Sequence, residues 1–257
     1  MKQRPTFPAR LEPQATGARP TPAKLVSGIG LPVLNRPQGL GMDSAAHRQR
    51  LVQLLQKQGV RDEAVLAAMG HVERHRFVDS ALVNQAYEDT SLPIGLGQTI
   101  SKPGVVSRMI ELLRNGNAGK LGRVLEIGTG CGYQAAVLSQ LAQEVYSIER
   151  LRGLHDKARE NLRHFRLPNV HLLFGDGRVG YAQGAPYAAI IAAAGGEAVP
   201  QAWIDQLAVG GRLVAPVVRD GSQGGAQALL VLDKTSGGVR QTLLEAVHFV
   251  PLKSGVA

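Results

Sequence analysis

The chain has 257 residues, of which 44% are hydrophobic and 19% are charged, as in ordinary folded proteins. Its formal net charge is +9, and residues 1–43 account for +4 of that value, with six Lys or Arg against two acidic residues. A charge spread in this way does not favour a nucleic-acid-binding surface. No apolar run is long enough to cross a membrane, and the N-terminus lacks the pattern of a signal peptide. We therefore expect a cytoplasmic protein with no membrane partner and no stable nucleic-acid partner.

An extension precedes the predicted domain. Seven of the fourteen prolines fall within the first 37 residues, where no apolar period is sustained. This pattern predicts that residues 1–43 are disordered. A single domain is expected over residues 44–257, with a helical part at 44–121 and a cofactor-binding sheet at 122–257.

The spacing of apolar residues predicts three helices in the first part of this domain, over about residues 44–58, 62–69 and 103–113. Asp43 or Ser44 is expected to cap the first of them, and Pro103 stands at the tolerated first position of the third. The region from Val72 to Pro103 is expected to be irregular. Because it is longer than a simple connector requires, it is also a candidate functional loop.

From Arg123 onward, apolar strands alternate with helices, which is typical of a doubly wound α/β sheet. The predicted strands span 123–127, 144–148, 169–174, 187–193 and 211–217, and the predicted helices span 132–142, 152–165 and 200–207. Two further runs, 227–233 and 240–250, flank a turn at 234–238 and predict a C-terminal antiparallel hairpin. This order resembles the Rossmann-like sheet of class I methyltransferases, which is mostly parallel with helices on both faces.

A glycine loop follows the first strand of this sheet. Gly128, Gly130 and Gly132 stand at alternate positions, which allows a tight turn and a close approach of a nucleotide-like ligand. The pattern is G-x-G-x-G, because Tyr133 follows Gly132 where a dinucleotide-binding fingerprint needs a different spacing. The single cysteine, Cys131, lies within the loop and is expected to be a small packing residue rather than a nucleophile.

Three acidic residues end three successive predicted strands. Glu126 is placed to meet the positively charged amino group of a methionyl cofactor, directly or through water. Glu149 is placed to accept hydrogen bonds from two ribose hydroxyls, and Asp176 to receive an adenine amino group. Acids at strand ends are often merely solvated, but three together favour S-adenosyl-L-methionine as the methyl donor, with S-adenosyl-L-homocysteine as the product.

Over about residues 47–257 the chain closely resembles the protein-L-isoaspartate O-methyltransferases. The segments that carry the resemblance are Val72–Val78, Ala86–Asp89, Leu92–Pro103, the glycine loop and Ala246–Leu252. The resemblance implies methyl transfer to the side-chain carboxylate of isoaspartyl residues, and to a lesser extent D-aspartyl residues, in damaged proteins and peptides. The methyl ester then closes to a succinimide, whose hydrolysis returns part of the material to aspartate. A monomer that needs no metal ion is expected.

Matching positions imply the residues of the site. Ser101 would be the catalytic hydroxyl that orients the acceptor carboxylate, although from the residues alone it also fits an N-cap of the following helix, and the two roles are compatible. The acceptor peptide is expected against Ser101, Val250, Pro251 and Leu252. The predicted cofactor-binding residues are Gln98, Thr99, Ile100, Ser101, Glu126, Gly128, Thr129, Gly130, Gly132, Tyr133, Glu149, Asp176, Gly177 and Gln227.

The chain departs from the family pattern at four positions, which bear on acceptor affinity and on the rim of the site. Ala188 and Ala193 stand where Asp and Thr are usual, Arg178 stands where an aromatic residue is common, and His248 replaces a basic residue of the last strand. These departures and the positive net charge leave two alternatives open. One is a class I methyltransferase that acts on RNA or a small molecule, and the other is a non-catalytic binder of damaged proteins.

Overall fold

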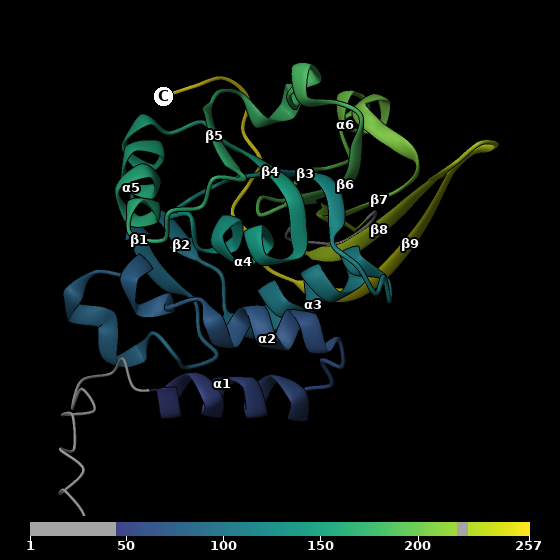
Figure 1. Cartoon of the computed structure of the whole chain (residues 1–257). Helices are drawn as coiled ribbons and strands as arrows, with labels where there is room; N and C mark the ends of the chain where they lie inside the picture. Colours follow the sequence, from purple (N-terminus) through teal and green to yellow (C-terminus); the bar gives the residue numbers. More distant parts are fainter. Residues whose placement is uncertain (1–44, 220–225) are drawn as a thin grey trace, which may run out of the picture. The chain divides into compact units, whose positions relative to one another are not determined.

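The computed structural model describes residues 45–219 and 226–257, so the predicted extension and the predicted cap at Asp43 or Ser44 lie outside the described residues. A seven-stranded sheet has the order β5-β4-β3-β6-β7-β8-β9 (Figure 1). Strands β3 to β7 pair in parallel, and β8 and β9 add an antiparallel hairpin. These strands are β3 (Leu121–Ile127), β4 (Ala142–Glu149), β5 (Val170–Phe174), β6 (Tyr187–Ala192), β7 (Leu207–Val218), β8 (Gln227–Thr235) and β9 (Gly238–Val247). The predicted fold class is confirmed.

Helices cover both faces of this sheet. They are α1 (Ala45–Lys57), α2 (Glu63–His71), α3 (Pro103–Arg114), α4 (Tyr133–Leu141), α5 (Arg152–Arg163) and α6 (Gln201–Gln206). Two single-turn 3₁₀ helices, η3 (Gly177–Val179) and η4 (Ala182–Gly184), follow β5. Among the described helices, none is long and apolar enough to cross a membrane.

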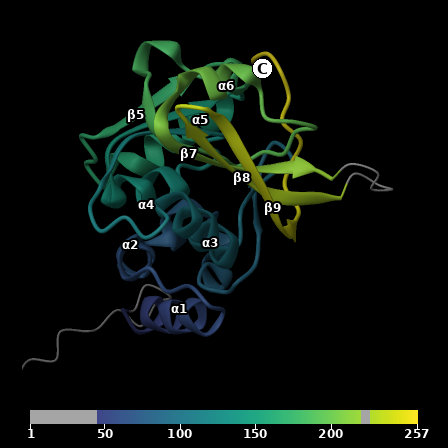
Figure 2. The same ribbon diagram turned by 90° about the vertical axis from the view of Figure 1, so that its right-hand side faces the viewer.

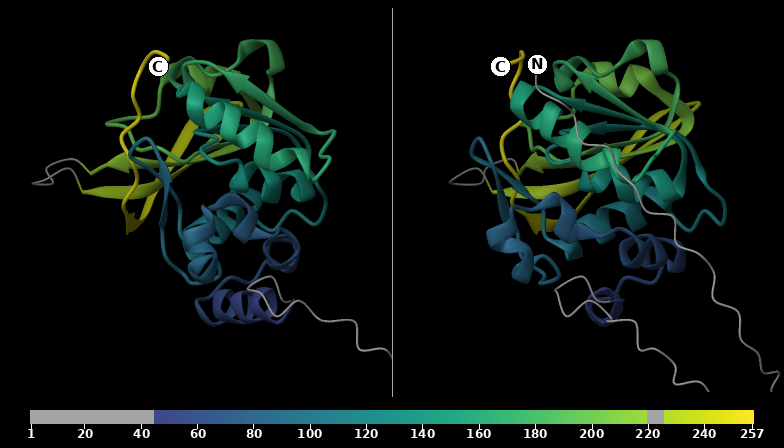
Figure 3. Two further views of the ribbon diagram at one scale, coloured as in Figure 1. Left: turned by 90° about the vertical axis from the view of Figure 1, so that its left-hand side faces the viewer. Right: turned by 60° about the vertical axis from the view of Figure 1, so that its left-hand side comes forward.

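Alternation along the strands divides the buried side chains into two cores. Val124, Ile191 and Val214 belong to the core beneath α1 to α5, whereas their neighbours Leu125 and Ile190 belong to the core beneath α6. The views in Figures 2 and 3 show α1 and α2, in blue, on the side of the sheet away from α6. Most of the helical mass therefore lies on one face.

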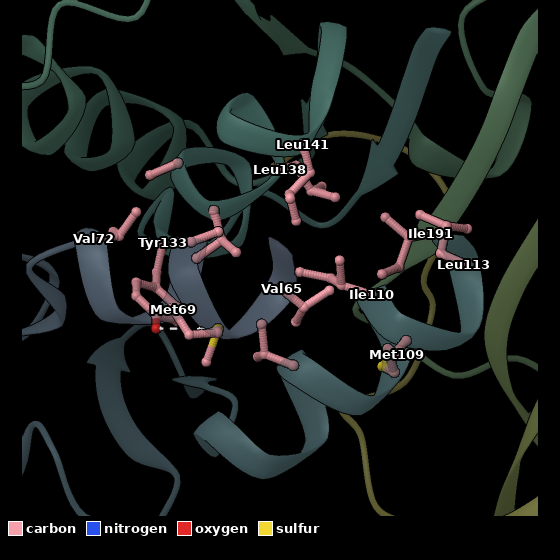
Figure 4. Packing of buried hydrophobic residues seen from close by; sticks show 14 of the residues in the cluster. Val65, Met69, Val72, Met109, Ile110, Leu113, Tyr133, Leu138, Leu141 and Ile191 are labelled. Carbon is pink, nitrogen blue, oxygen red and sulfur yellow. Dashed lines mark hydrogen bonds between the residues drawn. The ribbon is translucent and has the colours of Figure 1, made fainter. Parts of the chain in front are cut away.

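The N-terminal helices share the core that supports the glycine loop. Met69 of α2 and Ile110 of α3 pack in one cluster with Leu138 of α4 and Ile191 of β6 (Figure 4). In the same cluster, the Tyr133 hydroxyl at the start of α4 donates a hydrogen bond to the Met69 sulfur at 3.7 Å. Movement of α2 would therefore displace Tyr133, the first residue of α4, which follows the glycine loop.

The region between α2 and α3 is more regular than the sequence suggests. It forms two 3₁₀ helices, η1 (Arg74–Phe77) and η2 (Ser80–Gln85), and a two-stranded hairpin of β1 (Leu92–Gly95) and β2 (Gln98–Ile100). Phe77 is its anchor, since the ring lies 5.5 Å from the Tyr133 ring and 5.2 Å from the Phe165 ring. Isolated anchors of this kind leave no period in the sequence, so the expectation of an irregular loop was wrong.

The last predicted strand is too long by three residues. β9 ends at Val247, and the chain then leaves the sheet edge to run beside Gly195. The Gly195 amide donates to the Val250 carbonyl at 2.8 Å, and the Leu252 amide donates to the Gly195 carbonyl at 2.7 Å. This change of partner carries Val250, Pro251 and Leu252 from the outer edge to the carboxyl end of β6.

Candidate active site

A cavity of about 420 Å³ lies at the carboxyl ends of β3, β4 and β6. The chain leaves β3 for β4 on one side and returns through β6 on the other, so this is the topological switch point at which open α/β sheets bind ligands. The volume is typical of a small-molecule site. Thirteen predicted site residues line the cavity: Gln98, Thr99, Ile100, Ser101, Gly128, Thr129, Gly130, Tyr133, Glu149, Gly177, Val250, Pro251 and Leu252.

The last two glycines of the loop have different functions. Gly130 has a φ of 57° and lines the cavity, and a Cβ added there would lie 3.2 Å from the Ile94 Cδ1 atom. Gly132 has a φ of 92° and does not line the cavity, and its added Cβ would lie 3.1 Å from Leu162 of α5. Gly132 therefore allows close packing of the loop against α5, whereas Gly130 keeps the cavity wall free of a side chain.

The Glu149 carboxylate ends β4 and is fixed on the cavity wall. One oxygen accepts a hydrogen bond from the Gly130 amide and the other from the Leu151 amide, both at 2.9 Å, and the residue is 5% exposed. Each carboxylate oxygen has a second lone pair. The carboxylate is therefore held by the backbone with acceptor capacity still available to a pair of hydroxyl groups.

Glu126 ends β3 behind the wall and is fully buried. The Ser147 hydroxyl donates to its Oε2 atom, and the hydroxyls of Ser147 and Thr129 are 2.6 Å apart. Its Oε1 atom has no partner within the described part of the chain. Burial raises the pKa of Glu126 from 4.5 to about 8, although Ser147 and Gln134 favour the ionised form. Glu126, near the carboxyl end of β3, is thus a buried carboxyl group with no positively charged partner among the described residues.

The raised pKa of Glu126 predicts how the stability of the protein depends on pH. Between pH 4.5 and about 8, the folded protein keeps a proton on Glu126 that the unfolded chain has lost, so the free energy of unfolding falls as pH rises. The contribution of one such proton is about 1.4 kcal/mol per pH unit. Glu126→Gln should remove this contribution, so the variant should gain stability relative to the parent as pH rises from 5.5 to 7.5. Urea denaturation without cofactor at several pH values measures it, and parallel profiles would contradict it.

Asp176 and Gln227, like Glu126 and Gly132, are predicted cofactor residues that lie outside the cavity lining. The Asp176 carboxylate accepts hydrogen bonds from the Arg178 amide at 2.8 Å and from the Gly255 amide at 2.6 Å, which ties the end of β5 to the C-terminal segment. The Gln227 side chain accepts from the Phe249 amide at 2.7 Å and donates to the Phe249 carbonyl at 3.2 Å. Gln227 therefore fixes the segment that precedes Val250, while Asp176 lies beside Gly177, which does line the cavity.

The Ser101 hydroxyl is free on the cavity wall. Ser101 is half-buried, and within the described residues its Oγ atom forms no hydrogen bond. The N-cap of α3 is Lys102, without a side-chain capping bond, and the Gly104 amide instead donates to the Asp89 carboxylate at 2.6 Å. Asp89 therefore satisfies the helix start that Ser101 was a candidate to cap. The capping alternative is not what the structure shows.

Cys131 lines the cavity but is buried, and burial raises the pKa of its thiol to about 11. A thiol that stays protonated is a poor nucleophile. The Cys131 carbonyl also accepts a hydrogen bond from the Asn161 side chain of α5 at 2.9 Å. The residue therefore packs and fixes the loop, in agreement with the sequence analysis.

Several residues that line the cavity were not predicted from the sequence. Ile94 and Leu96 of the β1–β2 hairpin line one wall, and Arg150 and Lys253 bring two cationic side chains to the cavity. Leu96 stands between two glycines, a turn signal that could have marked it. Arg150 and Lys253 directly follow predicted site residues. No sequence pattern marked Gln134 as a lining residue, because a glutamine in a buried helix belongs to no recognisable motif.

Three of the four departures from the family pattern lie away from the cavity lining. Ala188 is the second residue of β6, at the end of the strand opposite the cavity, and neither Arg178 nor His248 lines it. Ala193 does line it, next to Gly128, where an added Cβ would be 3.6 Å from the Ala193 Cβ atom. The departures therefore leave the walls of the cavity unchanged except at Ala193.

A mostly parallel sheet that ends in an antiparallel hairpin, a G-x-G-x-G loop and a cavity at the switch point together fit the class I methyltransferases, which use S-adenosylmethionine. The model of the protein-L-isoaspartate(D-aspartate) O-methyltransferase family matches residues 46–257, and the chain belongs to this family. A protein-L-isoaspartate O-methyltransferase of Methylibium petroleiphilum is 63% identical over 221 residues, which cover 85% of this chain and 81% of that one. One of Leptothrix cholodnii is 60% identical, covering 85% and 77%.

Solved structures agree with this assignment. A protein-L-isoaspartate O-methyltransferase structure superposes with a TM-score of 0.72 at 28% identity, covering 81% of this chain and 67% of that one. A Plasmodium falciparum protein described as such a methyltransferase, in complex with S-adenosyl-L-homocysteine, shares the fold with a TM-score of 0.69 at 24% identity, covering 80% and 98%. The chain is thus an enzyme that transfers a methyl group from S-adenosylmethionine to isoaspartyl residues in damaged proteins, which initiates their repair. Neither alternative left open by the sequence is supported.

Proposed function

We propose that the cavity holds S-adenosylmethionine against the glycine loop and that Ser101 orients the acceptor carboxylate beside it. The observation that carries the proposal is that Ser101, whose hydroxyl forms no hydrogen bond within the described residues, lines the same cavity as the glycine loop and the fixed Glu149 carboxylate. The segment Val250–Leu252, on the same cavity, would hold the backbone of the acceptor peptide.

The residues present suit the donor. Glu149 would accept hydrogen bonds from the two ribose hydroxyls, and Gly128 and Gly130 would allow the ligand to approach the backbone. Glu126 supports the fit in a second way, since its unpartnered Oε1 atom would be compensated by a cationic amino group, directly or through water. Asp176 would receive the adenine amino group while it holds Gly255. The remaining proposed contacts are Gln98, Thr99, Ile100, Thr129, Tyr133 and Gly177, which line the cavity, whereas Gly132 and Gln227 would act through the loop and the C-terminal segment that they hold.

Bound S-adenosylmethionine supplies an activated methyl group, and the chain supplies alignment. An acceptor carboxylate with a pKa near 4 is ionised at neutral pH, so no general base is required. The Ser101 hydroxyl would donate to one carboxylate oxygen and leave the other aligned for reaction, while the β1–β2 hairpin excludes water. No step in this scheme calls for a metal ion, and we propose that none is used.

We further infer the setting of the enzyme. The domain would span residues 44–257, because α1, α2 and α3 share one core with the sheet and no second core lies among the helices of 44–121. We propose that it acts in the cytoplasm as a monomer on damaged proteins and peptides, without a nucleic-acid partner. The single buried cysteine suits a reducing compartment.

The test is transfer of labelled methyl from S-adenosylmethionine to a short isoaspartyl peptide, with the normal aspartyl peptide as the control. We expect label on the isoaspartyl peptide alone, and we expect it to be released by mild base, because a methyl ester is base-labile. Label on both peptides would remove the specificity for isoaspartate. No label on either, with cofactor binding confirmed by calorimetry, would contradict the proposed acceptor site.

A further inference from the structure

The tip of the β1–β2 hairpin has an unusual backbone for a wall of a binding site. Gly95, Leu96 and Gly97 have φ values of 98°, 52° and 68°, so three successive residues are in the left-handed region. A leucine adopts this conformation only where its surroundings require it. Leu96 is also 62% exposed, so burial of its own side chain is not what holds the tip.

The hairpin contains a carbonyl that the strand pairing leaves free for another donor. Pro93 pairs with Thr99 and Gly95 with Gln98, and the register shifts between Pro93 and Gly95, so Ile94 lies at an irregularity of the ladder. Such a residue has no regular partner on the opposite strand. Its side chain is buried, lines the cavity and approaches Gly130, so the position of Ile94 sets the distance between the hairpin and the glycine loop.

The donor to this carbonyl is Lys157 of α5. Its ammonium donates to the Ile94 carbonyl at 2.9 Å and to the Asp79 carboxylate, at the start of η2, also at 2.9 Å. The side chain of Lys157 is 29% exposed and that of Asp79 is 63% exposed, so the bond to Ile94 is partly shielded from water and the ion pair is not. A Cβ added to Gly153 in the first turn of α5 would lie 3.1 Å from Leu96, which places the hairpin tip against the same helix.

These contacts join the two halves of the site. Helix α5 begins directly after the turn that carries Glu149, whereas the hairpin leads through Gln98 into Ser101. Lys157 does not line the cavity itself, and its bond to the Ile94 carbonyl is its direct link to a residue that does. A hydrogen bond from a charged donor is among the stronger ones in proteins, so its loss should leave the β1–β2 hairpin free to move away from α5.

We propose that Lys157 is a positioning residue that holds the β1–β2 hairpin against α5 and thereby sets Ser101 relative to the cofactor site. This inference rests on the proposed role of Ser101. The cofactor contacts come mainly from the sheet, at the glycine loop and Glu149, so a displaced hairpin should impair the reaction with the acceptor more than it impairs cofactor binding.

The test compares Lys157→Met, which keeps the length and loses the donor, with Lys157→Arg, which restores a cationic donor. We expect kcat/KM for an isoaspartyl peptide to fall about 10-fold to 100-fold in Lys157→Met, the size expected for one lost charged hydrogen bond. The Kd for S-adenosylmethionine should change less than about threefold, and Lys157→Arg should recover part of the activity. Amide hydrogen exchange over residues 94–100 should become faster in Lys157→Met.

Two controls separate the possible results. Arg159→Met removes an exposed cation from the same helix and should leave activity and exchange unchanged. Asp79→Asn removes the ion pair and keeps the bond to Ile94, so it should be close to the parent. Unchanged exchange and unchanged kcat/KM in folded Lys157→Met would overturn the inference, as would an equal loss of cofactor affinity. If Lys157→Met does not fold, Lys157→Ala, which also has no donor, carries the same test.

The exchange measurement needs no acceptor, so it decides the inference independently of the reaction. If the parent enzyme failed to methylate the isoaspartyl peptide, the proposed function would fall. Faster exchange of the hairpin in the lysine variant would still show that Lys157 holds it, and unchanged exchange would still show that it does not.

Discussion

Ser101→Ala should lower kcat for an isoaspartyl peptide by about 10²-fold, the size of loss expected when the acceptor carboxylate is no longer held in line with the methyl group. The Kd for S-adenosylmethionine should stay within about threefold, because Glu149 and the glycine loop are untouched. The variant should fold normally, since the Ser101 hydroxyl has no hydrogen bond within the described residues and the start of α3 is bound by Asp89. Steady-state kinetics and calorimetric binding of the cofactor measure the two quantities.

Ser91→Ala is a suitable control for this variant, because Ser91 is exposed, precedes the same hairpin and does not line the cavity. Its turnover should equal that of the parent. An unchanged kcat in Ser101→Ala would remove the hydroxyl from the reaction. An equal loss in both variants would assign the effect to the hairpin as a whole rather than to Ser101.

Gly130→Val should raise the Kd for S-adenosylmethionine by roughly 100-fold or more, with the fold retained. The loss of affinity comes from the new side chain, which would enter the space that the cofactor is proposed to fill; an overlap of a few kcal/mol is about 100-fold in affinity. The left-handed backbone of Gly130 and the approach of the added Cβ to Ile94 lower the stability of the variant instead. Calorimetry of the folded variant, checked by circular dichroism, gives the result.

Gly116→Val offers the matched control for backbone strain. Gly116 has a φ of 75°, follows α3 and has nothing within 4 Å of an added Cβ. It should therefore lose stability without losing affinity for the cofactor. Normal affinity in Gly130→Val would contradict the placement of the cofactor at the glycine loop, whereas equal loss of affinity in both variants would point to general destabilisation.

The sheet could be predicted closely from the sequence because its signals are local. Strand β3 runs into glycines, and each parallel strand is an apolar run followed by a turn, so the predicted and observed strands differ by a few residues at their ends. The order of the strands was predicted only as a class. The hairpin β1–β2 and the helices η1 and η2 were not predicted, because they depend on isolated contacts such as Phe77 with Tyr133 that have no period.

The candidate site was predictable where its wall is formed by a local sequence motif. Gly128, Gly130, Glu149 and Ser101, which were named from motifs, line one cavity, and their roles toward a ligand stay predictions. Gln227 and Asp176 lie behind the lining, because hydrogen bonds over 22 and 79 residues of sequence tie them to the C-terminal segment. No local pattern contains such a pairing. For the same reason Lys157, whose partner Ile94 is 63 residues away, carried no signal at all.

The buried thiol of Cys131 offers a way to observe the enzyme opening. The chain has a single cysteine, and it lies in the glycine loop with its pKa raised to about 11. A thiol-reactive dye can modify it only when the loop moves enough to admit the reagent, because the thiol is 3% exposed on the cavity wall and stays protonated while it is buried. The rate of labelling would therefore report the frequency of that opening at one defined point. A ligand that occupies the cavity should slow the labelling in proportion to its occupancy.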